Sequence, residues 1–149
     1  MRLPLVVFVG VVGCGQHFSD SLEPFAQTAW TERVSGLKCD HQLTFYPDGK
    51  HLEAMICIFP DYSMGAEMNK GTYHVNGPTL TVDFAQTTCP TDHSGSVEFS
   101  LNGDTLTLYP SGGLILFAPT AFAPGEPQGI PFGCFDENWK FTPMDLHSI

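Results

Sequence analysis

A chain of 149 residues with a formal net charge of −10 at pH 7 is long enough for one domain with a substantial core. Its acidity argues against proteins that bind nucleic acid or anionic lipid headgroups through a basic surface. Charged residues make up only 15% of the sequence and aromatic residues 12%, including 12 Phe, which excludes a chain that is disordered throughout.

The N-terminus begins with an apolar run, LPLVVFVGVVGCGQ at 3 to 16, that stops at a cysteine. Arg2 precedes the run and the small residue Gly13 precedes Cys14, which is the order of a secretory signal. The run is shorter than the roughly 18 apolar residues that a transmembrane helix needs, and it contains Pro4. We therefore expect an export signal over residues 1–13.

The segment Val11-Val12-Gly13-Cys14 resembles the lipobox of bacterial lipoproteins. The resemblance implies cleavage before Cys14 and lipidation of its sulfur and new amino group, with acyl chains such as palmitate. Such an anchor would hold the protein in a membrane of the cell envelope. Gly15 follows the cysteine, which by analogy with enterobacterial lipoproteins implies the outer membrane. Residues 14–28 are then a lipidated, flexible tether. The alternative is an ordinary signal peptide with a cysteine near its end.

From Trp30 onward, apolar and polar residues alternate with the period of β-strands. We predict strands at 29–34, 41–47, 52–59, 71–75, 79–85, 95–101, 104–109, 113–118 and 138–142. Asp48-Gly49, Asn76-Gly77 and Asn102-Gly103 lie between these runs and are typical of hairpin turns. No ten residues show a helical period free of Pro and Gly. The predicted fold is an all-β, antiparallel up-and-down meander that closes into an eight- or nine-strand barrel and so hides its edges.

Two segments interrupt this regular pattern. ICIFPDYSMGAEMNKG at 56–71 is predicted to contain a long connection. APTAFAPGEPQGIPFG at 118–133 is rich in Pro and Gly and is predicted to be a surface loop held by Cys134. A single barrel domain over 29–149 contains both.

Four cysteines remain once Cys14 is assigned to lipid, and an even number in an exported domain suggests two disulfides. Folding the chain about Asp48 brings Cys39 opposite Cys57, so this pair is preferred among the three possible pairings. Cys89–Cys134 then follows by elimination. A zinc site is disfavoured because no two cysteines have the close spacing of a metal-binding motif.

The sequence offers little support for catalysis. It has no Gly-x-Ser-x-Gly elbow, and none of its six histidines are spaced to share a metal ion. Asp40-His41 and Asp92-His93 are neighbours along the chain, so their side chains point to opposite faces of a strand, and we expect surface histidines. Asp136-Glu137 is interpreted as solvated charge in a loop. The prediction is therefore a protein that is not an enzyme and uses no cofactor or metal.

Several segments together resemble the small lipocalin-like lipoproteins of bacteria, within the calycin group of β-barrels. They are Trp30 at the start of the first strand, LTFYPDGK at 43–50, GTYHVNGPTLTV at 71–82 and VEFSLNGDTLTL at 97–108. The resemblance implies an eight-stranded barrel whose interior can hold a small apolar ligand.

The alternating pattern also predicts which apolar side chains line the barrel. The ligand-pocket candidates are Phe45, Met55, Tyr73, Val82, Phe84, Phe99, Leu106 and Leu108, and the same pattern turns Leu114 and Leu116 inward. Three functions stay open: a small apolar ligand in the barrel, an envelope-protein partner bound by loops such as that around Tyr62, Met64 and Met68, or, least favoured, an enzyme. A solid aromatic core would leave an accessory or structural protein. A cavity of roughly 300 Å³ or more would favour the ligand.

Overall fold

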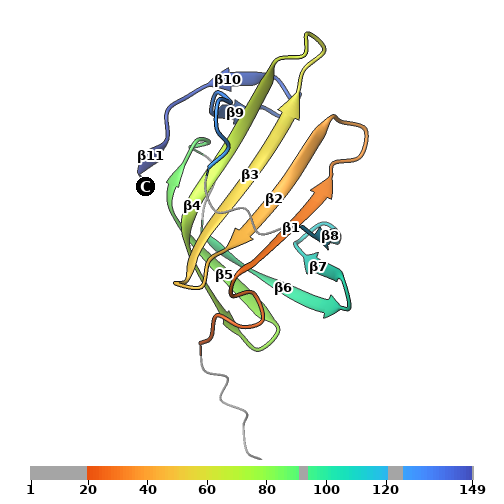
Figure 1. Cartoon of the computed structure of the whole chain (residues 1–149), viewed down its shortest axis with the longest axis vertical. Coiled ribbons are helices and arrows are strands. Elements are labelled where there is room, and N and C mark those ends of the chain that lie inside the picture. Colours follow the sequence, from red (N-terminus) through yellow and green to blue (C-terminus); the bar gives the residue numbers. More distant parts are fainter. Residues whose placement is uncertain (1–19, 91–93, 121–125, 149) are drawn as a thin grey trace, which may run out of the picture.

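A computed structural model describes residues 20–90, 94–120 and 126–148, and every regular element within them is a β-strand (Figure 1). In chain order these are β1 (Thr28–Arg33), β2 (Cys39–Phe45), β3 (Lys50–Ile58), β4 (Met64–Asn76), β5 (Thr79–Thr87), β6 (Gly95–Asn102), β7 (Thr105–Tyr109), β8 (Ile115–Pro119), β9 (Gly133–Phe135), β10 (Phe141–Pro143) and β11 (His147–Ser148). None of the described residues forms a helix with the length and apolar character of a membrane span.

The strands β1 to β8 pair with their neighbours in sequence order, always antiparallel, and form a closed barrel. Closure comes from β8, which pairs back with β1 through Trp30 opposite Pro119 and Thr31 opposite Ala118. This confirms the predicted up-and-down barrel. Closure removes the free edges that an open meander would expose. Outside the barrel, β11 extends the sheet by pairing with the end of β5, and β9 and β10 form a separate two-stranded sheet.

The fourth strand is much longer than predicted. It begins at Met64 instead of residue 71 and pairs with β3 along its whole upper half, so the long connection predicted within 56–71 is wrong. Only the short turn at 59–63 links the two strands. Its first half shows no alternation because residues on both faces are buried: Phe141 lies against Gly65 on one face, and Ala66 and Met68 are fully buried on the other.

The N-terminal segment before β1 closes one end of the barrel. Phe25 is fully buried and its ring lies 4.6 Å from that of Phe45 and 4.9 Å from that of Phe99. Ser21 exchanges two backbone hydrogen bonds with Val75. Residues 20–28 therefore pack against the barrel, unlike the flexible tether predicted for 14–28. The predicted export signal, Cys14 and the rest of the tether up to residue 19 lie outside the described residues.

One predicted strand has its faces reversed. Ile115 and Phe117 point into the barrel, whereas Leu114 and Leu116 are 58% and 54% exposed. Residues 114–117 read LILF, so polarity does not distinguish the two faces of this strand. Its pairing with β7, in which Leu106 lies opposite Phe117 and Leu108 opposite Ile115, decides the orientation.

Both predicted disulfides are present. Cys39–Cys57 joins residues directly opposite each other on β2 and β3, as the fold about Asp48 predicted. Cys89–Cys134 ties the chain just after β5 to β9. The described part of the Pro/Gly-rich segment also contacts β4, because Ala66 donates its N–H to the carbonyl of Pro131.

Candidate functional site

A cavity of about 360 Å³ opens at the end of the barrel opposite Phe25. Phe45 forms its floor, since this ring packs against Phe25 on its other side. Most of the lining is apolar and comes from β2, β3 and the strands β5 to β8. The lining residues are His41, Leu43, Phe45, His51, Glu53, Leu80, Val82, Phe84, Gly95, Ser96, Val97, Leu108, Pro110 and Ile115.

Half of the predicted pocket residues line this cavity and half do not. Phe45, Val82, Phe84 and Leu108 contribute to its wall. Leu106 and Tyr73 are buried in the core and Phe99 packs against that core, so these three side chains fill the end that Phe25 closes. Met55 lies farther along β3, opposite His41 and Glu67. The barrel is therefore solid at one end and hollow at the other.

Tyr73 shows how the solid end is organised. Its hydroxyl donates to the backbone carbonyl of Tyr46 at 3.1 Å, and its ring packs edge-on against Phe45. Burial, followed by the charges of Glu23 and Asp48, raises the pKa of Tyr73 to about 12. The phenol is thus a neutral structural donor, bonded to the hairpin turn and turned away from the cavity.

A charged cluster forms the polar wall of the barrel where β1, β2 and β3 lie side by side. His41 on β2 is held between two carboxylates: its Nδ1–H donates to Glu32 Oε1 at 3.2 Å and its Nε2–H to Glu53 Oε1 at 2.7 Å. Glu32 faces His41 directly in the strand register. The side chain of His41 is only 13% exposed. The three groups therefore share a largely dry environment, in which their attraction is weakly screened.

The carboxylates decide the charge of His41. Burial lowers its pKa, but hydrogen bonds to Glu32 and Glu53 and the attraction of both charges outweigh burial and raise it to about 9. Burial acts to raise the pKa of Glu53. The hydrogen bond and charge of His41, with smaller contributions from His51 and from a hydrogen bond with Asn69, outweigh burial and lower it. At neutral pH the cluster contains an imidazolium between two carboxylates.

His51, two residues before Glu53 on the same face of β3, behaves differently. Its Nδ1–H donates to the backbone carbonyl of Thr44 at 3.0 Å. Its ring stacks on Phe45, with centroids 4.6 Å apart, and lies nearly parallel to Phe84 at 6.2 Å. Burial is the largest influence on its pKa, which is lowered. His51 is therefore neutral, and its Nε2 is a hydrogen-bond acceptor.

Sequence reasoning missed this cluster because it placed His41 on the surface. The adjacent Asp40 does point the other way, to Arg33, whose Nε lies 3.0 Å from Asp40 Oδ1. His41 lies an even number of residues from Phe45, which was predicted to face inward, so both side chains lie on the same face of the strand. That shared parity is the signal that would have placed the histidine inside the barrel.

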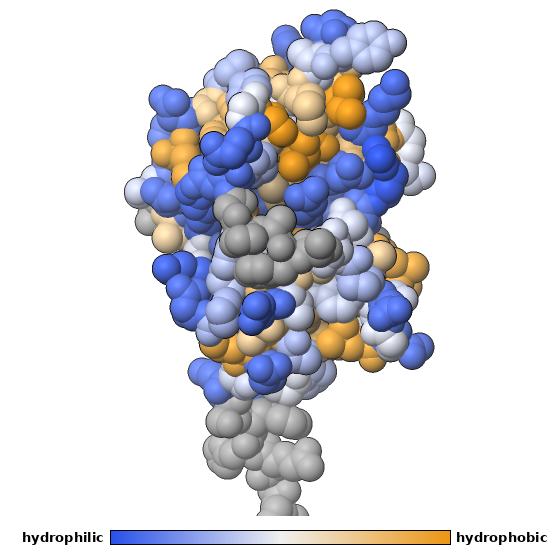
Figure 2. Space-filling view, viewed as in Figure 1, coloured by the Kyte–Doolittle hydropathy of each residue, from blue (hydrophilic) through white to orange (hydrophobic). Residues whose placement is uncertain are grey.

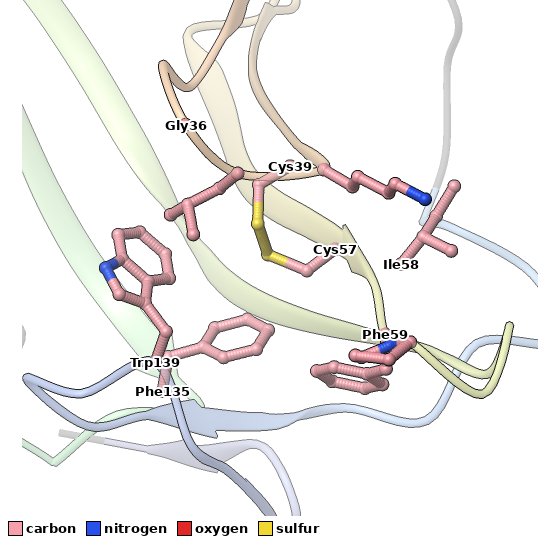
Figure 3. A pocket seen from close by; sticks show the side chains of 10 residues that line it. Gly36, Cys39, Cys57, Ile58, Phe59, Phe135 and Trp139 are labelled. Atoms are coloured by element: carbon pink, nitrogen blue, oxygen red, sulfur yellow. A yellow bond between two sulfur atoms is a disulfide. The ribbon is translucent and has the colours of Figure 1, made fainter.

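A second hollow of about 350 Å³ lies outside the barrel, beside the Cys39–Cys57 disulfide (Figure 3). Phe59, Phe135 and Trp139 surround it, and Trp139 is 40% exposed. Figure 2 shows apolar residues gathered toward this upper end of the molecule. The hollow resembles a shallow, largely apolar contact surface, whose one charged lining residue among the described residues is Lys38.

The loop predicted to bind a partner is only partly exposed on the surface. Tyr62 is 84% exposed and Met64 is also exposed, but Met68 is completely buried within β4. The surface predicted to bind a partner here is thus reduced to a short turn.

Two other groups with metal-ligating or acid-base side chains have structural roles. Glu67 lies beside Cys89 and Cys134, but these sulfurs are joined in a disulfide and offer no thiolate. Glu67 instead accepts the backbone N–H of Phe135. Asp136 accepts the N–H groups of Asn138 and Lys140 at 2.8 and 2.9 Å, so this carboxylate organises a turn. The charged cluster in the barrel therefore remains the principal chemical feature of the described residues.

Comparison with known proteins does not add to this description. No protein-family model matches the chain, and searches of curated proteins and of solved structures find no significant match. The interpretation of the cavity thus depends on its own residues.

Proposed function

We propose that this protein is a lipid-anchored lipoprotein of the bacterial cell envelope whose lipocalin-like barrel binds a small, largely apolar ligand. The observation that carries the binding proposal is the cavity of about 360 Å³ at the open end of the barrel. This volume lies at the lower end of the range of roughly 300–1,000 Å³ that is usual for small-molecule sites. A solid-core accessory protein would have no such space.

The composition of the wall supports the same function. Aliphatic and aromatic side chains from five strands surround the space, and its few polar side chains include His41, His51 and Glu53. Small-molecule sites combine such apolar walls with a few placed polar groups, because apolar burial supplies affinity and polar groups orient the ligand. The acid-base groups are bonded to one another, which favours binding over catalysis.

The location is proposed on separate grounds. Two disulfides are typical of proteins that fold in an oxidising compartment. The lipobox-like sequence that ends at Cys14 adds the membrane anchor. Residues 15–27 would then connect the lipid to β1, with the last of them packed against the closed end of the barrel.

Binding of the neutral fluorescent probe N-phenyl-1-naphthylamine tests the proposal. The Cys14→Ser protein, purified without lipid, should bind one probe per chain. Val82→Phe should abolish this binding because it adds a ring inside the cavity. Thr72→Phe makes a change of similar size on the outer face of β4 and should bind the probe normally.

The folded state of each variant is checked by its thermal unfolding. The proposal fails if the parent protein does not bind the probe, or if Val82→Phe binds it as tightly as Thr72→Phe. The first result would favour a solid-core or structural role. The second would place the probe outside the barrel, for example at the hollow beside Trp139.

A further inference from the structure

We propose that the barrel cavity selects amphipathic ligands with a positively charged donor at the polar end, such as alkylamines, over carboxylates of the same length. This inference rests on the proposed binding function and names the ligand class. It follows from which hydrogen-bonding groups of the cavity are already used within the protein and which remain for a ligand.

The side-chain N–H donors of the charged wall are already engaged. Both ring N–H groups of His41 donate to carboxylates, one to Glu32 and one to Glu53. The single N–H of neutral His51 donates to the carbonyl of Thr44. Ser96, the hydroxyl-bearing residue of the lining, shares a hydrogen bond with Thr81 in which either hydroxyl can donate. A ligand carboxylate needs donors, and each of the two histidines would have to break an existing bond to provide one.

Acceptors, by contrast, face the cavity. Glu53 carries two carboxylate oxygens with two lone pairs each. Oε1 accepts from His41 and the carboxylate also accepts from the side chain of Asn69, so lone pairs remain for a ligand donor. His51 contributes the lone pair of Nε2, because its proton is on Nδ1. A ligand ammonium or hydroxyl group can donate to these atoms without disturbing the contacts of His41.

The charge of the wall acts in the same direction. Glu32 and Glu53 are two negative charges, and the imidazolium of His41 compensates one of them. Neither Lys nor Arg is among the lining residues in the described part of the chain. The wall thus has one net negative charge, which attracts a cation and repels an anion in an environment where water screens poorly.

The arrangement of the lining also separates the two ends of the ligand. The charged groups come from β2 and β3, whereas β5 contributes Leu80, Val82 and Phe84. Leu108 on β7 and Ile115 on β8 extend this apolar wall. A hydrocarbon chain can lie against these strands while its head contacts Glu53.

Octylamine, 1-octanol and octanoate, which each have eight carbon atoms and carry different head groups, test the inference by competition with N-phenyl-1-naphthylamine at neutral pH. We expect octylamine to bind about 10-fold or more tightly than octanoate, the difference that one charged hydrogen bond supplies. Octanol should fall between them. Val82→Phe should abolish competition by all three, which shows that they bind inside the barrel.

Two variants test whether Glu53 causes the preference for octylamine. Glu53→Gln should reduce the ratio of the octylamine affinity to the octanoate affinity to near one, while octanol still binds. Asp83→Asn removes one negative charge from an exposed position on β5 and should leave the ratio unchanged. If Glu53→Gln does not fold, the head-group series on the parent protein still decides the ligand class.

The results separate this inference from the function on which it rests. If octanoate competes as strongly as octylamine, and Val82→Phe abolishes competition by both, the inference is overturned. Ligand binding in the barrel then still stands. A preference for octylamine that survives Glu53→Gln, or that Asp83→Asn removes, also overturns it, because the surface charge would then be responsible. Absence of any binding by the probe or the three ligands refutes the proposed function itself.

Discussion

Raising the pH through the alkaline range should destabilise this protein through one residue, His41. Its imidazolium is held by Glu32 and Glu53 in the folded barrel, and unfolding exposes it to water. The pKa is therefore about 9 in the folded state and close to the ordinary 6.5 in the unfolded state. The stabilising contribution is complete below about pH 6.5 and is lost as the pH rises through about 9.

The size of the effect follows from this interval. At about 1.36 kcal/mol for each pKa unit, the difference between 6.5 and about 9 corresponds to about 3 kcal/mol of unfolding free energy. The group is largely buried, so solvent screens little of this amount. Such a loss is a large fraction of the roughly 5–15 kcal/mol that stabilises an ordinary domain.

Denaturant unfolding measured at intervals between about pH 6 and pH 10 tests this expectation. The Cys14→Ser protein is suited to it because the other four cysteines are paired in disulfides, so no thiolate can exchange with them. Tyr73, with its pKa of about 12, titrates above this range. His41→Gln serves as the comparison, because it keeps a donor but cannot titrate. Parallel profiles for the parent and His41→Gln would refute the reasoning.

Two further predictions concern the sheet and the anchor. Gly71→Ala should lower the unfolding free energy by roughly 2 kcal/mol or more in denaturant unfolding, because its Cβ would lie 1.9 Å from the carbonyl oxygen of Asp83. Gly95→Ala has open space around its Cβ and should change stability little; similar losses for the two variants would contradict the argument. Cys14→Ser should move the protein from the detergent phase to the aqueous phase in bacterial extracts, and equal partitioning of both forms would refute the lipid anchor.

Local signals predicted much of the fold. Alternation located β2, β5, β6 and β7 to within a few residues, and the Asn-Gly turns lie where predicted. The fold about Asp48 also located the Cys39–Cys57 disulfide, because a hairpin turn sets the pairing of both strands that follow from it.

Signals of this kind disappear where both faces of a strand are alike. The first half of β4 has buried residues on both faces, Gly65 and Asn69 on one and Ala66 and Met68 on the other, so no alternation revealed it. Residues 114–117 are all apolar, so the prediction of which face points into the barrel was wrong. Phe25 lay in a segment without pattern, and only its contact with Phe45 and Phe99 gives it a place in the core.

The sequence by itself determined an all-β chain, the main hairpin turns and one disulfide, because each depends on residues that are neighbours along the chain or across one turn. The cavity and its charge were decided only by the tertiary structure. Glu32, His41 and Glu53 meet because three strands lie side by side, and Ile115 completes the opposite wall only after β8 has closed on β1. The folded barrel brings together residues that no local pattern relates, and the two carboxylates beside His41 then hold it in its charged form against the effect of burial.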